Sequence, residues 1–369
     1  MTHRLLILGA SYGSLLAGKL LLAGHEAHLV CTAATAALIE KEGIHVRFPA
    51  RGEGPALTLH SRLLPGRLHA LEPARVDPAD YDLVVFAMQE AQYGSSGVDA
   101  LMHRIAAARR PCLAIMNMPP PPYLRRLGIT EPDLRGAYAH PEVWDAFDPA
   151  LITMASPDAQ AFRPPGERKN VLQVGLPTHF KTARFAAPAL DALLERLAHD
   201  IDAARLLVDG VATDVPVKLK LFASPYVPLA KWPMLVTGNY RCLDADGACA
   251  IRDAVHRDLA ASRALYGWVT ELCIALGAHP EDLVPFEKYA AASLHLVKPS
   301  SAARALMAGA PAIERVDKLV QQLAAARHRR SETLDFIVWR VDARLALNRA
   351  RAAASADTPI AAIYGVASV

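Results

Sequence analysis

A glycine-containing turn near the N-terminus has the residue types and spacing of an anion-binding site. It follows the apolar run 5–8 and consists of Gly9, Ala10, Ser11, Tyr12, Gly13 and Ser14. The first glycine of such a turn permits a tight bend, and a later glycine lets the next helix pack closely on the strand. The free N–H groups and positive dipole end of that helix can then hold a phosphate. We expect these six residues to bind the pyrophosphate of a dinucleotide, although the turn is one residue short of the usual pattern or carries Ser11 for its second glycine.

The residue that ends the second predicted strand normally selects between the two nicotinamide cofactors. An acidic residue holds the ribose hydroxyls of NAD, whereas an arginine accommodates the additional phosphate of NADP. Here the run 27–30 is followed by Cys31-Thr32-Ala33-Ala34-Thr35, which contains neither. The Thr32 hydroxyl could hydrogen-bond with either form. We therefore expect NADP as the cofactor with only a slight preference, and NAD as an acceptable substitute.

The elements that must position this turn alternate between strands and helices. Continuous apolar runs, typical of strands buried on both faces of a parallel sheet, occur at 5–8, 83–86 and 113–116, and 27–30 is predicted as a further strand. Helical patterns separate them, including 15–22 and 98–108. Strands alternating with helices predict an α/β fold, with a doubly wound sheet of the Rossmann type. Further along, the consecutive prolines 119–122 predict a stiff loop, 137–185 reads as short strands and loops, and 190–207 reads as a helix.

The second half of the chain has a different pattern. From Pro228 onward the strand signals end, and alanine-rich helical periodicity predicts helices over 253–276, 313–326 and 333–354. A chain of 369 residues is too long for one ordinary core. We therefore predict a Rossmann NAD(P)-binding domain over 1–220, followed by an all-α domain over 221–369 that carries the substrate chemistry.

Composition and charge argue against several other classes of protein. Hydrophobic residues make up 52% of the chain and charged residues 21%, as in ordinary globular proteins. The net charge of +3 gives no reason to expect nucleic acid or an acidic membrane as partner. The five scattered cysteines form no C-x-x-C pair and indicate neither a zinc site nor a disulfide framework, so we expect no bound metal. Because Gly9 and Gly13 interrupt the first apolar run, we expect no signal peptide and a cytoplasmic location.

The sequence resembles the ketopantoate reductases (2-dehydropantoate 2-reductases), taken as a broad family, over nearly its whole length. The resemblance lies in the opening segment 7–26, in 40–44, in 82–92 and in 116–118. It implies a 6-phosphogluconate-dehydrogenase-C-like helical domain after the Rossmann domain, and a homodimer. Gln89 stands where the family has the lysine of K-x-x-Q, and Asn117 where it has the asparagine beside the nicotinamide. Both residues are therefore expected to contact the cofactor.

The resemblance also implies a catalytic lysine in the family pattern K-x-x-x-N-x-x-x-N. Lys231 and Asn239 match that pattern, and Leu235 replaces the first asparagine. Steps of four would place these three positions on one face of a helix, although Pro233 fits a first helical turn and places Lys231 at the helix start. Hydride addition to a ketone builds negative charge on the oxygen, which a lysine can stabilise and protonate. Asn239 would hold a hydroxyl or carboxylate of the substrate.

A second family landmark, S-S-M…T-E-I-D, contains a glutamate that binds substrate. Ser301 matches its serine pair and is expected to bind substrate. Alignment through Val316-Asp317 puts Arg315 at the glutamate position, and a shift of one residue restores Glu314. An arginine would favour a carboxylate-bearing substrate and a glutamate a hydroxyl-bearing one. Either charge could instead be a solvated charge on a helix.

These features predict an NAD(P)H-dependent oxidoreductase that transfers hydride to a 2-oxo acid or a related carbonyl or imine. Lys231, Asn239 and Glu314 would be catalytic, and the small-molecule substrate would carry a carboxylate. One alternative is an opine-dehydrogenase-like condensation of an amino acid with an oxo acid. His140-Pro141 resembles the His-Pro of those enzymes, but it precedes the helical region and we interpret it as a loop histidine. The other alternative is a dinucleotide-binding protein without catalysis, which the departures from the family pattern favour.

Overall fold

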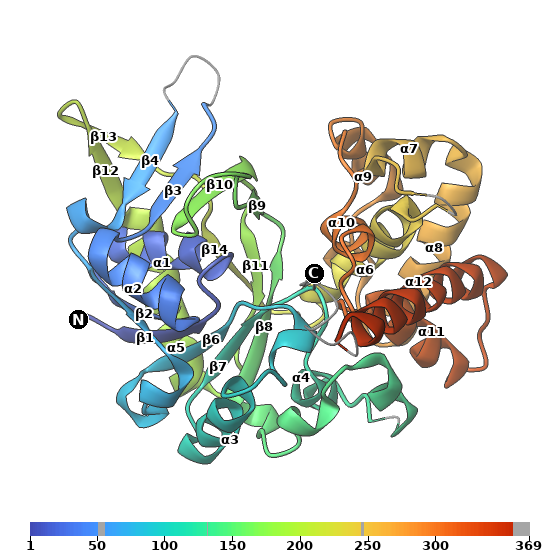
Figure 1. The fold of residues 1–369 in the computed structure, drawn as a ribbon, viewed down its shortest axis with the longest axis horizontal. Helices are drawn as coiled ribbons and strands as arrows, with labels where there is room; N and C mark the ends of the chain where they lie inside the picture. Colours follow the sequence, from blue (N-terminus) through green and yellow to red (C-terminus); the bar gives the residue numbers. More distant parts are fainter. Residues whose placement is uncertain (51–55, 131, 245–246, 357–369) are drawn as a thin grey trace, which may run out of the picture. The chain divides into compact units, whose positions relative to one another are not determined.

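The computed structural model describes residues 1–50, 56–130, 132–244 and 247–356. Within these parts, one compact unit comprises 1–50, 56–130, 140–229 and 276–282, and a second comprises 132–139, 230–244, 247–275 and 283–356. The first unit contains the large sheet with its helices, and the second is helical (Figure 1). The predicted fold class, a Rossmann-type α/β sheet followed by an all-α region, is confirmed.

An eight-stranded sheet in the order β14-β11-β8-β7-β6-β1-β2-β5 forms the centre of the first unit. Its strands, in chain order, are β1 (Arg4–Leu8), β2 (Glu26–Val30), β5 (Arg67–Leu71), β6 (Leu83–Phe86), β7 (Cys112–Ile115), β8 (Ile152–Pro157), β11 (Phe180–Ala183) and β14 (Leu219–Phe222). The six strands from β5 to β8 in this order are parallel to one another. This is the Rossmann order, in which the direction of progression reverses at the first strand.

Strand β14 extends past residue 220, where we placed the domain boundary. It remains in the first unit because it pairs in parallel with β11, which in turn runs antiparallel to β8. That the two units fold and bind their ligands as separate domains stays a prediction.

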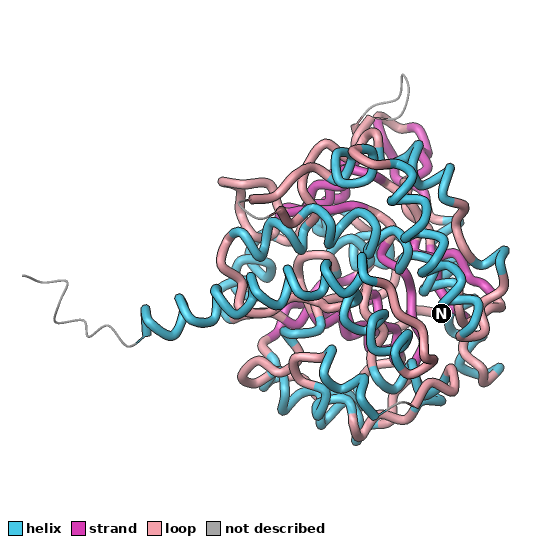
Figure 2. The backbone as a smooth tube through the Cα atoms, turned by 90° about the vertical axis from the view of Figure 1, so that its right-hand side faces the viewer, coloured by secondary structure: helices cyan, strands magenta, loops and turns pink. Residues whose placement is uncertain are grey.

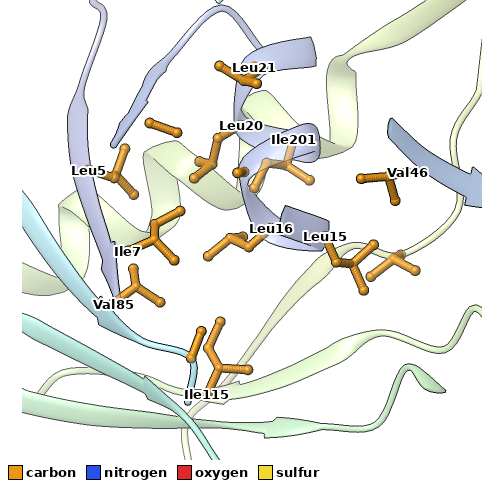
Figure 3. Close-up of a cluster of buried hydrophobic side chains, with 14 of the residues drawn as sticks. Leu5, Ile7, Leu15, Leu16, Leu20, Leu21, Val46, Val85, Ile115 and Ile201 are labelled. Atoms are coloured by element: carbon orange, nitrogen blue, oxygen red, sulfur yellow. The ribbon is translucent and has the colours of Figure 1, made fainter. Parts of the chain in front are cut away.

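Helix α1 is the centre of the hydrophobic core of the first unit. Every residue of α1 (Gly13–Leu22) is buried, because the helix packs against β1 and β2 and also against α5 and the smaller sheet. Figure 3 shows Leu15, Leu16 and Leu20 of α1 among Ile7 of β1 and Ile201 of α5. The other helices of this unit are α2 (Ala33–Glu42), α3 (Val98–Ala108), α4 (Pro121–Arg126) and α5 (Pro188–Ala203).

A four-stranded sheet in the order β4-β3-β10-β9 lies beside α1 in the same unit. Its strands are β3 (His45–Phe48), β4 (Leu57–His60), β9 (Gln160–Phe162) and β10 (Val171–Leu176), and a separate hairpin consists of β12 (Arg205–Val208) and β13 (Val211–Asp214). Two local predictions were wrong. The helix predicted over 190–207 ends at Ala203, before β12. Of the four prolines predicted as a loop, Pro121 and Pro122 begin α4, because proline's fixed φ suits a first turn, where its missing N–H has no helical partner.

The second unit consists of helices joined by short turns. They are α6 (Trp232–Met234), α7 (Ile251–His256), α8 (Leu259–Ala275), α9 (Phe286–Ser293), α10 (Ser301–Met307), α11 (Val316–Ala325) and α12 (Glu332–Ala356). The helix predicted over 253–276 is thus divided into α7 and α8. The longest helix, α12, ends in the turns that project at the left of Figure 2. Among the described residues, no helix is both long and apolar enough to cross a membrane.

Helix α1 carries a lysine inside the core. Lys19 is 1% exposed, and its Nζ donates a hydrogen bond of 2.7 Å to the carbonyl of Val215. Burial, with the nearby positive charge of Lys218, lowers the pKa of Lys19 to about 7, while Asp214 opposes the shift.

This lysine predicts a pH dependence of stability. The unfolded chain binds more protons than the folded protein between about pH 7 and the pKa of a free lysine, about 10.4. The free energy of unfolding should therefore rise as the pH increases from about 7 to about 10.4. We expect Lys19→Met to flatten the rise between pH 7 and 9, measured by urea denaturation. Lys41→Met, which changes an exposed lysine on α2, should keep the wild-type slope, and an unchanged slope in Lys19→Met would contradict the assignment.

Candidate functional site

The predicted cofactor-binding residues lie at one edge of the large sheet. The glycine turn follows β1, Thr32 follows β2, Gln89 follows β6 and Asn117 follows β7. Because these strands are parallel neighbours, their carboxyl ends meet at the same edge. The strand order reverses at β1, and doubly wound sheets bind dinucleotides in the crevice at that reversal. The structure therefore brings these four positions together.

Gly9 makes the tight bend after β1. Its φ of +109° lies in the region that favours glycine, and its N–H donates to the Val30 carbonyl at 3.0 Å. A Cβ at this position would lie 2.7 Å from Cγ of Met88 and 2.8 Å from the carbonyl oxygen of Ala87. Only a residue without a side chain fits between β1 and the end of β6.

Gly13 is required for close packing of α1 on β1. A Cβ on Gly13 would lie 2.7 Å from Cγ2 of Ile7 on β1, so this glycine has the role of the last glycine in the dinucleotide pattern. Ser11 is exposed, and the Ser14 hydroxyl donates to the Ala10 carbonyl at 2.8 Å. No side chain caps the N-terminus of α1 within the described structure, and its first turn carries no acidic residue. The backbone N–H groups at the start of α1 therefore suit an anion.

An arginine that the sequence analysis did not identify lies against the glycine turn. Arg163 follows strand β9, and its Nη2 donates to the Ala10 carbonyl at 3.1 Å, 153 residues away along the chain. Its Nε is buried and makes no hydrogen bond with any residue that the structure describes. Burial raises the pKa of Cys31, at the end of β2, to about 11, and the positive charge of Arg163 opposes that rise. Arg163 therefore places positive charge near both the glycine turn and the end of β2.

The remaining cofactor candidates have different degrees of exposure. Thr32 is exposed, and its hydroxyl donates to that of Thr35 at 3.1 Å. Gln89 is also exposed, and its backbone N–H donates to Oε1 of Gln92 at 3.1 Å at the start of a short 3₁₀ turn. Asn117 is half-buried, directly after the central strand β7. Their contact with a cofactor stays a prediction.

Lys231 and Asn239 do not lie on a regular α-helix. Lys231 ends a 3₁₀ segment over 227–231, α6 spans only Trp232–Met234, and Leu235–Asn239 is a π-helix. A π-helix bonds residues five apart and therefore has a wider turn, so the steps of four that would put Lys231, Leu235 and Asn239 on one face do not apply. Pro233 does occupy the first turn of α6, as expected. Lys231 and Asn239 are both half-buried.

Tyr289 supports the π-helix from α9. Its hydroxyl donates to the Met234 carbonyl at 3.1 Å. Gly238 makes room for that hydroxyl, because a Cβ at Gly238 would lie 2.0 Å from it. The wide turn is therefore fixed by a tertiary contact, which the sequence pattern around Lys231 could not reveal.

The serine that contacts this segment is Ser300 rather than Ser301. Ser300 is 2% exposed, and its hydroxyl donates to the Asn239 carbonyl at 2.7 Å while accepting from the N–H of Ala303 at 3.0 Å. It thus caps α10 and holds the end of the π-helix. Ser301 is the exposed first residue of α10, and its binding of substrate stays a prediction.

Glu314 and Arg315 are buried rather than solvated on a helix, with exposures of 8% and 6%. The Tyr240 hydroxyl donates to the Glu314 carbonyl at 2.6 Å and accepts from the N–H of Val316 at 3.0 Å. This contact ties the segment before α11 to the residue that follows Asn239. Glu314 therefore adjoins the lysine-containing segment through the backbone.

Arg315 is largely neutralised by acidic residues. It forms a two-pronged pair with the wholly buried Asp317, at 2.9 and 3.0 Å, and also contacts Asp342. Burial alone would lower the pKa of Arg315, but the two carboxylates raise it, so the residue stays cationic. It borders a cavity of about 520 Å³ whose other charged residues are Lys318, Asp342 and Arg349. A substrate carboxylate would have to compete with Asp317 and Asp342 for Arg315.

Comparison with known proteins identifies this fold. No family model matches the sequence, and no significant match exists among curated proteins. The structure of D-mandelate dehydrogenase with NADH and anilino(oxo)acetate matches with a TM-score of 0.63 at 13% identity, covering 94% of this chain and 99% of that chain. A protein of Ralstonia solanacearum MolK2 assigned as a ketopantoate reductase matches with 0.64 at 16% identity, covering 95% and 99%.

The dimeric ketopantoate reductase from Staphylococcus aureus matches with a TM-score of 0.59 at 10% identity, covering 94% of this chain and 99% of that chain. The matches extend over both compact units. The chain therefore has the fold of the ketopantoate reductases and of D-mandelate dehydrogenase over nearly its whole length, as the sequence resemblance predicted.

Proposed function

We propose that the protein is an NAD(P)H-dependent reductase that transfers hydride to the carbonyl of a 2-oxo acid or a related imine. One observation carries this proposal: the glycine turn and the uncapped N-terminus of α1 lie where the strand order of a Rossmann sheet reverses. The fold supports it, because D-mandelate dehydrogenase, which has been seen with NADH and an oxo acid derivative, is built in the same way.

The two units would supply different parts of the reaction. Residues 9–14 would hold the pyrophosphate, and Asn117 would contact the nicotinamide ribose. A reduced nicotinamide held there would supply a hydride for the carbonyl carbon, which leaves negative charge on the carbonyl oxygen. The Lys231 ammonium would stabilise that oxygen and transfer its Nζ proton to it. Asn239, with Ser301 and Glu314, would orient the substrate.

The position of Arg163 favours NADP as the cofactor. The chain lacks an arginine at the end of β2, but Arg163 lies close enough to Cys31 to affect its pKa and also contacts Ala10. An arginine in this region can accommodate the additional phosphate of NADP. Arg163 would therefore take the place of the missing residue.

Homodimerisation through the second unit is the remaining part of the proposal. Helix α12 exposes the stacked rings of Phe336 and Trp339, which are 51% and 62% exposed. Exposed aromatic side chains of this kind are enriched at protein interfaces.

A charge at Ser11 should test the cofactor site without disturbing the core. Ser11→Asp would place a carboxylate beside the N-terminus of α1, where it repels the pyrophosphate, and we expect NADPH affinity to fall at least about tenfold, or about 1.4 kcal/mol. Substitution of Gly13 is a poorer test, because any side chain would meet Ile7. Ala212→Asp adds the same charge on the exposed hairpin and should bind normally. Normal binding by folded Ser11→Asp would refute the assignment of the turn.

Replacement of Arg163 should change cofactor preference. Arg163→Gln removes the charge, so the Kd for NADPH should rise about tenfold or more while the Kd for NADH changes little. Titration of intrinsic fluorescence with each cofactor measures both constants. Arg168→Gln, in the same loop and exposed, should alter neither. An equal loss for the two cofactors would mean that Arg163 only supports the glycine turn.

Replacement of Lys231 tests the catalytic step. With a panel of 2-oxo acids and NADPH, we expect Lys231→Ala to lower kcat by about 10²–10⁴-fold, the usual contribution of a positioned acid. NADPH affinity should be preserved. Lys231→Arg should recover little activity, because a guanidinium is a much weaker proton donor. Lys288→Ala, an exposed lysine of α9, is the control. An unchanged kcat in Lys231→Ala would end this mechanism, and a raised KM alone would assign the lysine to substrate binding.

A further inference from the structure

Two histidines and a glutamate gather on one face of the large sheet at its β5 edge. Glu26 and His28 are two residues apart on β2, so their side chains point to the same face. His69 lies directly opposite His28 in the parallel register of β2 and β5. Strand pairing thus brings His69 beside two side chains from a distant part of the sequence.

Their geometry is compact. The His28 and His69 ring centroids are 4.7 Å apart, and Nε2 of His28 is 2.6 Å from Oε1 of Glu26. One ligand atom from each residue can be chosen so that all three lie within 4.8 Å of one another. Glu26 and His28 have side-chain exposures of 17% and 13%, whereas His69 is 46% exposed. The cluster is therefore shielded on the β2 side and open to solvent on the β5 side.

Neighbouring groups orient these side chains. The Tyr81 hydroxyl lies 2.9 Å from Nδ1 of His28 and leaves Nε2 directed at Glu26. With an ion on Nε2, the ring proton would reside on Nδ1 and be donated to Tyr81. Metal-bound histidines characteristically have such a partner on the second nitrogen.

The charges around the cluster are mixed. Arg4 contacts Glu26 at 3.1 Å, and Arg67 on β5 is the register partner of Glu26. Oε1 of Glu40 is 3.9 Å from Nδ1 of His69.

We propose that Glu26, His28 and His69 form a binding site for a divalent transition-metal ion, with zinc as the best match. Two imidazoles and one carboxylate are an established zinc ligand set that leaves a fourth position for water, and the exposed side of His69 provides that position. We expected no metal because the chain has no paired cysteines, but that argument does not apply to a site made of two histidines and a glutamate. Binding would exchange the contacts of Glu26 with His28 and Arg4 for bonds to the ion.

The ion would join the edge strand β5 to β2. Glu26 begins β2, whereas Thr32 follows the other end of that strand, so this site is distinct from the proposed cofactor site. Because the ion would bind the folded sheet, it should stabilise the protein by mass action.

The test is a metal titration of the full-length protein after treatment with EDTA and dialysis. Zn²⁺ is followed by calorimetry and Co²⁺ by its visible absorption. We expect one ion per chain, a higher melting temperature with Zn²⁺, and at least about tenfold weaker binding in His69→Ala, since loss even of an outer-shell partner costs 10- to 100-fold. Arg4→Gln removes a competing cation and should bind more tightly than the wild type.

His60→Ala is the matched control, because His45 and His60 are also a cross-strand pair, with centroids 4.2 Å apart. It should bind the metal as the wild type does. Absence of saturable binding, or wild-type affinity in folded His69→Ala, would overturn the proposal. The Arg4→Gln variant tests the proposal without removing a ligand. Unchanged or weaker metal binding by this variant would contradict the assigned ligand set.

Discussion

The contact between Gly13 and Ile7 is the constraint on which the first unit depends. All of α1 is buried between two sheets and α5, so the helix cannot shift outward to accommodate a larger residue at its first position. The absence of a side chain at Gly13 lets the helix begin directly against β1. Its N–H groups are thereby placed at the carboxyl end of that strand, where a phosphate can reach them. Core packing and the capacity to bind an anion therefore depend on the same contact.

The charge near this turn comes from outside the first β-α-β unit. The end of β2 carries Cys31 and Thr32, which are uncharged at neutral pH, and Arg163 approaches from the chain after β9. The smaller sheet thus contributes to the proposed cofactor site as well as to the core around α1. A change in the loop that follows β9 would alter the electrostatics of the turn without changing any residue of the glycine pattern.

The sequence predicted the fold because its strongest signals are local. Strands β1, β6 and β7 are almost wholly buried and appear as continuous apolar runs, and Gly9 and Gly13 mark a turn that only glycine fits. Features that arise from tertiary contacts were not predictable. Arg163 meets Ala10 only after the chain has folded, Arg315 is buried by its pairing with Asp317, and the turn at Gly238 is opened by Tyr289. The start of α4 at Pro121 could have been recognised, since prolines are common in first turns.

The segment around Lys231 changes its hydrogen-bond pattern from 3₁₀ to α to π and back to 3₁₀ between 227 and 242. π-Helical turns are frequent at functional sites. Three side chains each fix one point of the segment. Tyr289 bonds to the carbonyl of Met234, Ser300 to the carbonyl of Asn239, and Tyr240 to the carbonyl of Glu314 in the non-helical chain before α11. With the backbone held at these points, Lys231 and Asn239 keep the orientations that the irregular helix gives them, and the proton transfer proposed for Lys231 would require such rigidity.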